Sequence, residues 1–156
     1  MPTYTIRQKI IQALYLVIAT TVDPDTNAPV WNNILKENLD DISNEQLPAV
    51  GLSEGDEEVL DELYPSITKK LSVFIEFRFE NKYGVDIYES FNYYLGVLQK
   101  ILFTEKNLAG YSYDIQEVGN TPRIVDRNDE LPGGVIMIDI YYKHINGNPF
   151  ASIYGA

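Results

Sequence analysis

The amino-acid sequence predicts an α+β domain in which two main helices pack on a mostly antiparallel sheet of about four strands. Two stretches carry apolar residues at helical spacing, and Leu71–Glu80 alternates between apolar and polar residues as a half-buried strand does. In the last third of the chain the expected strands follow one another without a helix between them. Such an order favours antiparallel pairing with helices on the sheet. A length of 156 residues is typical of one domain, here 1–156.

Two capping boxes mark the starts of the expected helices. Thr5 and Gln8 form a T-x-x-Q box, and Asp86 and Glu89 form a similar one. The first helix is expected to run to about Thr20 along an apolar stripe of Ile6, Ile10, Leu14, Val17 and Ile18. The second is expected to end before Gly110, with a stripe of Ile87, Phe91, Leu95, Leu98 and Leu102.

Two strands are expected before the second helix. The short apolar segment Leu47–Leu52 contains Pro48, which favours a brief edge strand. The strand Leu71–Glu80 places five apolar residues on one face, and Phe74 is the aromatic exception on its polar face. We therefore expect this strand in the sheet core, with Phe74 exposed.

After the second helix we expect a weak strand over Tyr111–Gly119, a turn at Asn120–Pro122 and a second extended piece over Arg123–Arg127. The last strand, Val135–Ile145, begins apolar on both faces, and a tight turn at Asn146-Gly147 ends it. Two explanations of that two-sided character remain open. Either helices cover both faces of the sheet, or a second surface is buried against another subunit.

Composition excludes several classes of protein. The chain has no cysteine, so thiolate and disulfide chemistry are absent. The formal net charge of −11 disfavours a general nucleic-acid binder, which needs cations to displace counterions from phosphates. No apolar run is long enough to span a bilayer, and no secretory signal is expected. Residues 37–62 hold ten acidic residues and no lysine or arginine, so much of the negative charge is local.

The stretch that begins at Asp23 resembles a calcium loop at first sight. Asp23, Asp25 and Asn27 occupy alternate positions, as the first three ligands of an EF-hand do. The sixth position, which requires glycine, is Ala28, and the twelfth, which requires glutamate, is Ile34. We therefore expect no metal ligand here.

No arrangement of residues predicts catalysis or a cofactor. The clustered carboxylates at 56–62 lack a histidine, and a solvated acidic loop or helix face is the simpler interpretation. His144 is the only histidine and is expected to be structural or exposed. Nucleotide-binding, nucleophile-elbow and zinc-protease motifs are absent from the sequence. The sequence thus predicts a protein that is not an enzyme, with no catalytic residues and no cofactor.

The segment 21–45 is expected to be a proline-stiffened connection. It carries Trp31, the only tryptophan, with Ile34 and Leu35 close behind. This apolar group should anchor the segment either on the chain's own core or on a neighbouring subunit.

At the level of family, the sequence resembles the tail terminator, or tail completion, proteins of long-tailed bacteriophages. The resemblance covers most of the chain and follows the order of its segments: the N-terminal helix, LPAVGL with SEGDEE, LSVFIEFRFEN, IYESFNYYLGVLQKILF, YDIQEVGNTPRIVD and GVIMIDIYYKHINGNPF. The closing strand that runs into Tyr-Lys-His and then Gly-Asn-Pro is its most specific part. Relative to shorter members, 21–45 has the character of an insertion.

The resemblance implies a structural virion protein at the head-proximal end of the tail, made in the host cytoplasm. Six copies would form a ring that caps the tail tube, ends tube polymerisation and joins the tail to the neck and head. DNA would pass through the ring without specific binding. We expect contacts with the tube protein, with a neck or head-completion protein and between copies, the last through Trp31, Phe74, Tyr141 and Tyr142. A lumen-facing acidic loop would comprise Glu54, Asp56, Glu57 and Glu58.

Two other functions remain open at this point. Another neck or head-tail joining protein of the same connector would share most of these features. A calcium-dependent binding module or a metal hydrolase using the acidic clusters is the alternative from a different class.

Overall fold

The computed structural model describes residues 3–35, 39, 42–82, 84–104, 106–124 and 131–153. The elements follow in the order α1 (Ile6–Ala19), β1 (Asn33–Leu35), η1 (Asn44–Gln46), β2 (Ala49–Leu63), β3 (Ser66–Arg78), α2 (Ile87–Thr104), η2 (Leu108–Gly110), β4 (Ser112–Arg123) and β5 (Gly133–Ile145). One sheet has the strand order β1-β2-β3-β5-β4, in which only the β1–β2 pair is parallel. The predicted α+β fold is confirmed, with five strands in the sheet where about four were expected.

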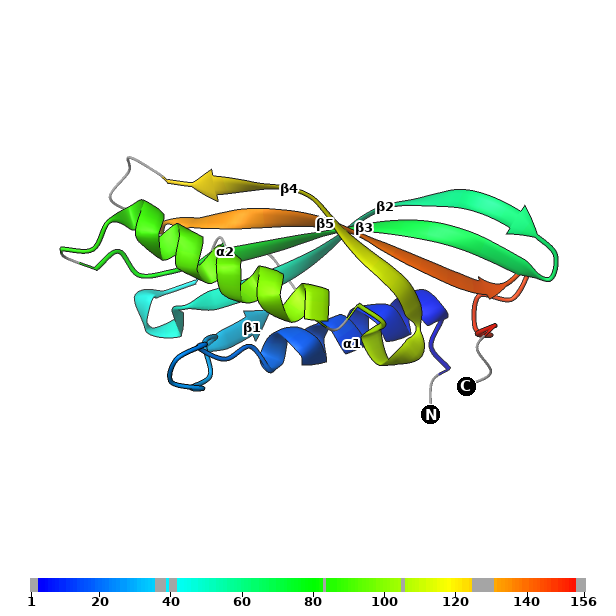
Figure 1. Ribbon diagram of the computed structural model, residues 1–156, viewed down its shortest axis with the longest axis horizontal. Helices are drawn as coiled ribbons and strands as arrows, with labels where there is room; N and C mark the ends of the chain where they lie inside the picture. The colour runs from blue at the N-terminus through cyan, green and yellow to red at the C-terminus, as the bar shows by residue number, and fades with distance from the viewer. Residues whose placement is uncertain are drawn as a thin grey trace.

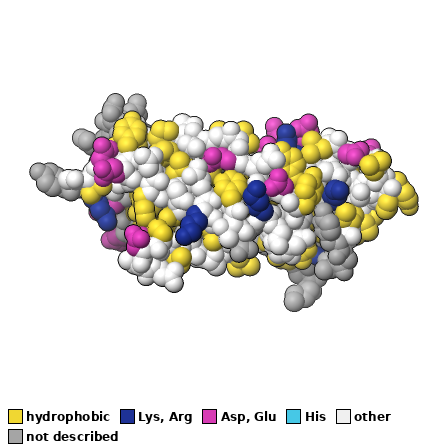
Figure 2. Space-filling model, in the orientation of Figure 1, with side chains coloured by type: hydrophobic (Ala, Val, Ile, Leu, Met, Phe, Trp, Pro, Cys, Tyr) yellow, Lys and Arg dark blue, Asp and Glu magenta, His cyan; other side chains and the backbone are white. Residues whose placement is uncertain are grey.

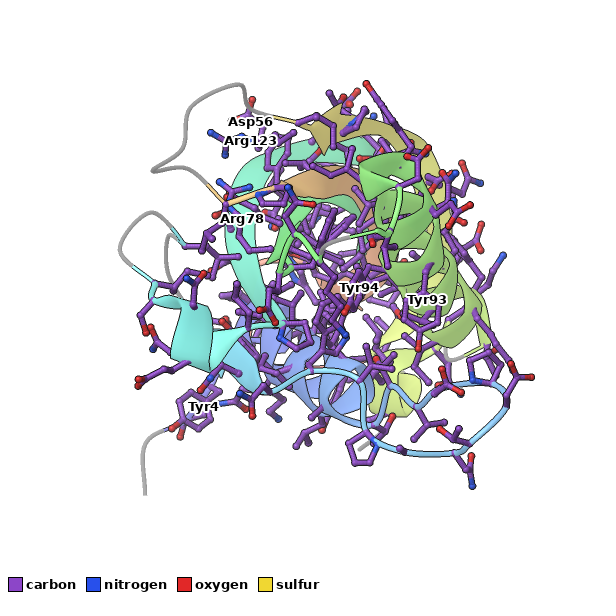
Figure 3. The ribbon with its side chains drawn as sticks, turned by 90° about the vertical axis from the view of Figure 1, so that its left-hand side faces the viewer. Tyr4, Asp56, Arg78, Tyr93, Tyr94 and Arg123 are labelled. Atoms are coloured by element: carbon purple, nitrogen blue, oxygen red, sulfur yellow. The ribbon has the colours of Figure 1, made fainter. Side chains whose placement is uncertain are left out.

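Both long helices lie on the same face of the sheet (Figures 1 and 3). They contact each other as well as the strands. At one end of the molecule the hairpin formed by β2 and β3 extends beyond both helices (Figure 1). Helices therefore do not account for the apolar residues on the second face of β5, and that face is open in the described part of the chain.

Helix α1 forms as its sequence predicts. The hydroxyl of Thr5 accepts a hydrogen bond from the backbone N–H of Gln8 at 3.1 Å, which satisfies one of the free donors of the first turn. The apolar stripe then lies against the sheet, with Ile10 and Leu14 fully buried. Helix α2 starts in a similar way, because the Asp86 carboxylate accepts from the N–H of Tyr88 at 2.7 Å.

The core lies between the two helices and the inner face of the sheet. Alternation in β3 and β5 sends every second side chain into it: Leu71, Val73, Ile75, Phe77, Ile136, Ile138, Ile140 and Tyr142. Phe77 stacks on Phe91 of α2 with ring centroids 5.8 Å apart. Gly134 makes this approach possible, since a Cβ there would come within 2.9 Å of Phe77 Cζ and nearer still to the Phe91 ring.

Strand β2 corrects the prediction for residues 47–62. It is not a brief edge strand followed by an acidic loop, because pairing with β3 continues from Ala49 to Leu63. On its other side β2 pairs with β1 only at residues 49–51. The acidic segment has little intrinsic strand propensity, but it lies opposite the cations of β3, and Glu58 pairs directly with Lys70.

Strand β4 corrects a second prediction. Asn120–Pro122 is not a turn, because β4 runs unbroken from Ser112 to Arg123 along β5. Pro122 is tolerated since β4 is an edge strand, where one side of the backbone needs no partner. Residue 124 follows the strand, and the rest of the expected piece that ends at Arg127 lies outside the described residues.

Trp31 anchors the 21–45 segment on the chain's own core. Its side chain is buried, and its ring lies 5.4 Å from Tyr94 and 6.2 Å from Phe77 between centroids. The residues that follow form the short parallel strand β1. Residues 36–38, 40 and 41 of the segment lie outside the described residues.

Candidate interaction surfaces

The face of the sheet opposite the helices carries a row of apolar and polar side chains from β3 and β5. Cross-strand register places Phe74 beside Met137, with Val135 and Tyr141 on the same face. Phe74 is 40% exposed, and the other three are half-buried. We call this surface, which is centred on Phe74, Met137 and Tyr141, the open face.

Gly55 of β2 explains how the Phe74 ring lies on the open face. A Cβ at position 55 would lie only 2.8 Å from Phe74 Cε2, so the ring occupies space that any other residue would fill. Sequence reasoning treated Phe74 as a single exposed aromatic and missed this pairing. The only signal for it in the sequence is a glycine inside an acidic run, opposite an aromatic strand residue.

Charged groups on the open face are largely paired. The Ser72 hydroxyl donates to Asp139 at 2.9 Å, and Tyr141 donates to Gln116 at 3.3 Å. Further ion pairs join Lys70 to Glu58 at 2.9 Å and Arg123 to Glu76 at 3.1 Å. The open face is therefore a mixed polar and apolar surface. Such a composition is typical of a surface that contacts another protein, whereas a groove that binds a polyanion carries unpaired cations.

The four residues expected at contacts between copies divide into two pairs. Phe74 and Tyr141 lie on the open face, where another molecule can reach them. Trp31 and Tyr142 face the helices and are buried in the chain's own core. The phenol of Tyr142 also donates a hydrogen bond to Glu57. Only Phe74 and Tyr141 remain candidates for contacts between copies.

The four acidic residues expected in a loop lie instead in strand β2, where they differ in position and partner. Glu54 and Glu57 lie toward α1, and Arg7 binds them at 2.8 and 3.5 Å. Glu57 also binds Lys69 at 3.0 Å. Asp56 lies at a bulge between Glu54 and Glu57, on the outer side of the sheet (Figure 3). Of the four, Asp56 and Glu58 are left near the open face.

Burial and ion pairing act on the pKa of Glu57 in opposite directions. Burial of its carboxyl raises the pKa, but the Tyr142 hydrogen bond and the contacts with Lys69 and Arg7 outweigh burial and hold the pKa below its ordinary value. The pKa of Tyr142 is raised, first by burial and then by its hydrogen bond to the carboxylate. The pair is therefore a carboxylate and a neutral phenol at neutral pH.

A small pocket adjoins this pair. Its volume is about 110 Å³, and His144 lines it together with Arg7, Lys69 and Glu57. His144 is buried, and its Nδ1 lies 2.8 Å from the backbone oxygen of Ile145. The space holds a few waters at most and the neighbouring cations are already paired with carboxylates, so this geometry favours a structural histidine.

The stretch from Asp23 is a turn stabilised by its own side chains. The Asp23 carboxylate accepts hydrogen bonds from the N–H groups of Asp25 and Thr26 at 2.9 and 2.8 Å and from Tyr93 Oη at 2.5 Å. These hydrogen bonds, of which the one from Tyr93 has the largest effect, lower the pKa of Asp23 to about 2. The alternating polar pattern thus reflects an Asx turn closed by a Val22–Pro29 bridge.

Two further surfaces were not expected from the sequence. A groove of about 650 Å³ lies between α1 and β2, with Ile11, Leu16 and Leu52 among its lining residues. At the hairpin end the apolar side chains Val59, Leu60, Leu63 and Tyr64 are exposed, and hydrophobic side chains gather at that end in Figure 2. We call the second surface, residues 59–64, the hairpin tip.

Among the described residues, no three histidine, cysteine or carboxylate side chains come together as metal ligands do. In the same part of the chain, neither helix combines the length and apolar character of a bilayer span. Comparison of the chain with protein-family models found no match, and comparison with curated proteins found none either.

Proposed function

We propose that this chain is a structural protein of a bacteriophage tail, a terminator that assembles as a six-membered ring on the end of the tail tube. The ring ends tube polymerisation and presents its other side to the neck and head. It performs no chemistry of its own and needs no cofactor. The proposal starts from the sequence resemblance, and one structural feature supports it most: helices cover only one face of the sheet.

The open face supports self-assembly for a physical reason. A soluble monomer gains little from exposing aromatic and sulfur-containing side chains on a flat sheet surface, whereas a subunit of a ring buries them against its neighbour. Phe74 is held in place on this face by Gly55, and Tyr141 is oriented by Gln116. Both side chains are thus preorganised, which lowers the entropic cost of making a contact.

Charge supports the passage of DNA through such a ring. Each copy carries a formal net charge of −11, so six copies form a strongly acidic ring that repels phosphates. Because Glu54 and Glu57 are neutralised by Arg7 and Lys69, we assign the lumen-facing role only to Asp56 and Glu58. Even there Glu58 is paired with Lys70, so the net charge of the ring matters more than any one residue.

Mechanistically, termination requires two different ring surfaces. One surface has to copy the docking surface of a tube subunit, and the opposite surface has to lack it, so that the next tube ring finds no partner. The molecule has two unlike ends along its long axis, since only one end carries the projecting β2–β3 hairpin (Figure 1). This asymmetry is what a cap needs.

Binding to the tail-tube protein tests this proposal. Purified chain should form an assembly of six times its 17.8 kDa mass in native mass spectrometry, bind tail-tube protein and stop its elongation. A neck or head-tail joining protein of the same connector would bind head-completion protein and leave tube growth unchanged, and that result would replace the terminator assignment.

A further inference from the structure

The turn that follows β5 contains the only Asn-Gly pair in the sequence, Asn146 and Gly147. The backbone N–H of Asn148 donates to the carbonyl of Ile145 at 2.9 Å and closes the turn. Asn146 and Gly147 are both exposed, and Gly147 has a φ of 80°, which glycine adopts without strain. Water therefore reaches both residues of the pair.

The two groups of this pair that can react with each other have no other partner. Neither the side-chain amide of Asn146 nor the backbone N–H of Gly147 forms a hydrogen bond within the described part of the chain. A Cβ at Gly147 would meet no atom within 4 Å, so nothing crowds the neighbouring nitrogen. Attack of that nitrogen on the side-chain carbonyl carbon closes a five-membered ring, and proximity within one chain favours such a reaction.

Two other exposed asparagines lack this arrangement. Asn148 precedes Pro149, whose nitrogen carries no hydrogen and cannot make the same attack. Asn27 precedes Ala28, whose N–H donates to a threonine hydroxyl at 3.3 Å. Of the three, only Asn146 combines a free amide with a free N–H on the next residue.

The segment after the turn, residues 148–151, holds the start of helix α1, and we call it the strap. The N–H of Ile6 donates to the carbonyl of Pro149 at 2.8 Å, so the strap satisfies one of the donors that the first turn of a helix leaves free. The N–H of Ile145 donates to the carbonyl of Ala151 at 2.9 Å. The strap and the start of α1 lie close to each other (Figure 1). Both bonds join the strap to residues that precede position 146, so both depend on the length of the backbone there.

We propose that Asn146 is a self-modifying site whose isoaspartate product releases the strap from helix α1. The backbone nitrogen of Gly147 attacks Cγ of Asn146. The N–Cγ bond forms, the Cγ–Nδ2 bond breaks, and the proton of the Gly147 N–H leaves with Nδ2 as ammonia. Water is the only co-reactant, and nothing is oxidised or reduced. This proposal is independent of the ring-forming function.

Water then opens the succinimide ring in one of two ways. Cleavage of the new N–Cγ bond gives aspartate at position 146, and the length of the main chain is unchanged. Cleavage of the original peptide bond gives isoaspartate, in which the main chain runs through Cβ and Cγ and is one methylene longer. The longer connection shifts the strap relative to β5, so that Pro149 no longer meets the N–H of Ile6.

Peptide mapping of the folded, full-length chain by mass spectrometry tests the site. On incubation in neutral buffer, position 146 should be the first asparagine to be modified, with a mass gain equal to the difference between water and ammonia. In water labelled with heavy oxygen, the added oxygen should carry the label. Asn148 is the internal control in the same segment and should stay intact.

Asn146→Gln is the matched variant, because its longer side chain would need a six-membered ring, and it should show no modification at position 146 over the same time. A second comparison uses the chain unfolded in guanidinium chloride. If Asn146 reacts there but stays intact in the folded chain, the turn protects the amide and the site is wrongly assigned.

Hydrogen exchange at the Ile6 amide tests release of the strap. The purified isoaspartate form should exchange this amide faster than the unmodified chain does. Asn146→Asp adds the same charge without lengthening the main chain, and it should exchange at the rate of the wild type. Equal exchange in the isoaspartate form and the wild type would contradict release. Faster exchange in Asn146→Asp as well would assign the effect to charge and overturn the role of backbone length.

Discussion

The phenol of Tyr142 donates a hydrogen bond to the carboxylate of Glu57, which joins β5 to β2 across 85 positions of sequence. Strands β2 and β5 are not neighbours in the sheet, because β3 lies between them. The bond therefore crosses above a central strand on the helix side, where Lys69 of β3 completes the cluster at 3.0 Å from Glu57. It fixes the acidic half of β2 to the core of the sheet.

Replacing Tyr142 by phenylalanine should destabilise the fold. The ring still fills its buried position, but the half-buried Glu57 carboxylate loses a donor, which costs about 1–2 kcal/mol. Urea unfolding of Tyr142→Phe measures this cost. Tyr88→Phe is the matched control. Tyr88 is exposed, so removal of its hydroxyl should change the free energy of unfolding by less than about 0.5 kcal/mol. Equal midpoints for the two variants would show that the hydrogen bond adds no stability.

Acidification should weaken the contribution of Glu57. Its pKa in the folded chain is held below the ordinary value of 4.5, so its stabilising effect is present above that value and is lost as the pH falls through the folded pKa. Glu57→Gln should therefore be less stable than wild type at neutral pH, and the difference should narrow in acid. A difference that stays constant between pH 7 and pH 3 would contradict the ion-pair assignment.

The carboxylate of Asp23 should titrate near pH 2. Carbon-detected NMR of the side-chain carboxyl group gives this midpoint directly, and the predicted value is about 2 against an ordinary 3.8. Because the Tyr93 hydroxyl is the largest cause, Tyr93→Phe should raise the midpoint toward the ordinary value. Tyr88→Phe on the same helix should leave it unchanged. A wild-type midpoint near 3.8 would mean that the turn does not hold in solution.

The close packing of β5 on α2 should make Gly134 intolerant of a side chain. A methyl group there would overlap the Phe77 and Phe91 rings, and overpacking of this kind costs about 1–3 kcal/mol. Gly119→Ala is the control in the same sheet, since its nearest neighbour would be Met137 Cε at an ordinary 3.5 Å. Thermal unfolding should show a lower midpoint for Gly134→Ala only. A similar loss at both positions would point to a general strand effect.

The elements that the sequence predicted well are those whose apolar pattern is local. Helix α1 and strand β5 each bury one periodic set of their own residues, so the pattern alone indicates type and approximate ends. Strand β2 is different, because the cations that pair with its carboxylates belong to β3 and α1. Nothing within the acidic segment itself distinguishes that strand from a solvated loop.

The same difference between local patterns and contacts with distant strands explains for which candidate contact residues the exposure was predicted correctly. Exposure of Phe74 follows from its place on the polar face of an alternating strand, which the sequence contains. Tyr142 is buried because its side chain lies on the same face of β5 as those of Ile136, Ile138 and Ile140. From the sequence alone, either Tyr141 or Tyr142 could have been the exposed tyrosine, because both faces of the strand are apolar. The groove beside Leu16 depends on where β1 stops pairing with β2, and only the three-dimensional arrangement specifies that position.

The length distribution of tail tubes tests the proposed function most directly. Tube protein is allowed to elongate with increasing amounts of purified chain, and tube lengths are measured by negative-stain electron microscopy. The terminator proposal predicts that mean length falls as chain is added and that labelled chain is found at one tube end only. Tubes of unchanged length and yield, with no chain at their ends, would contradict it.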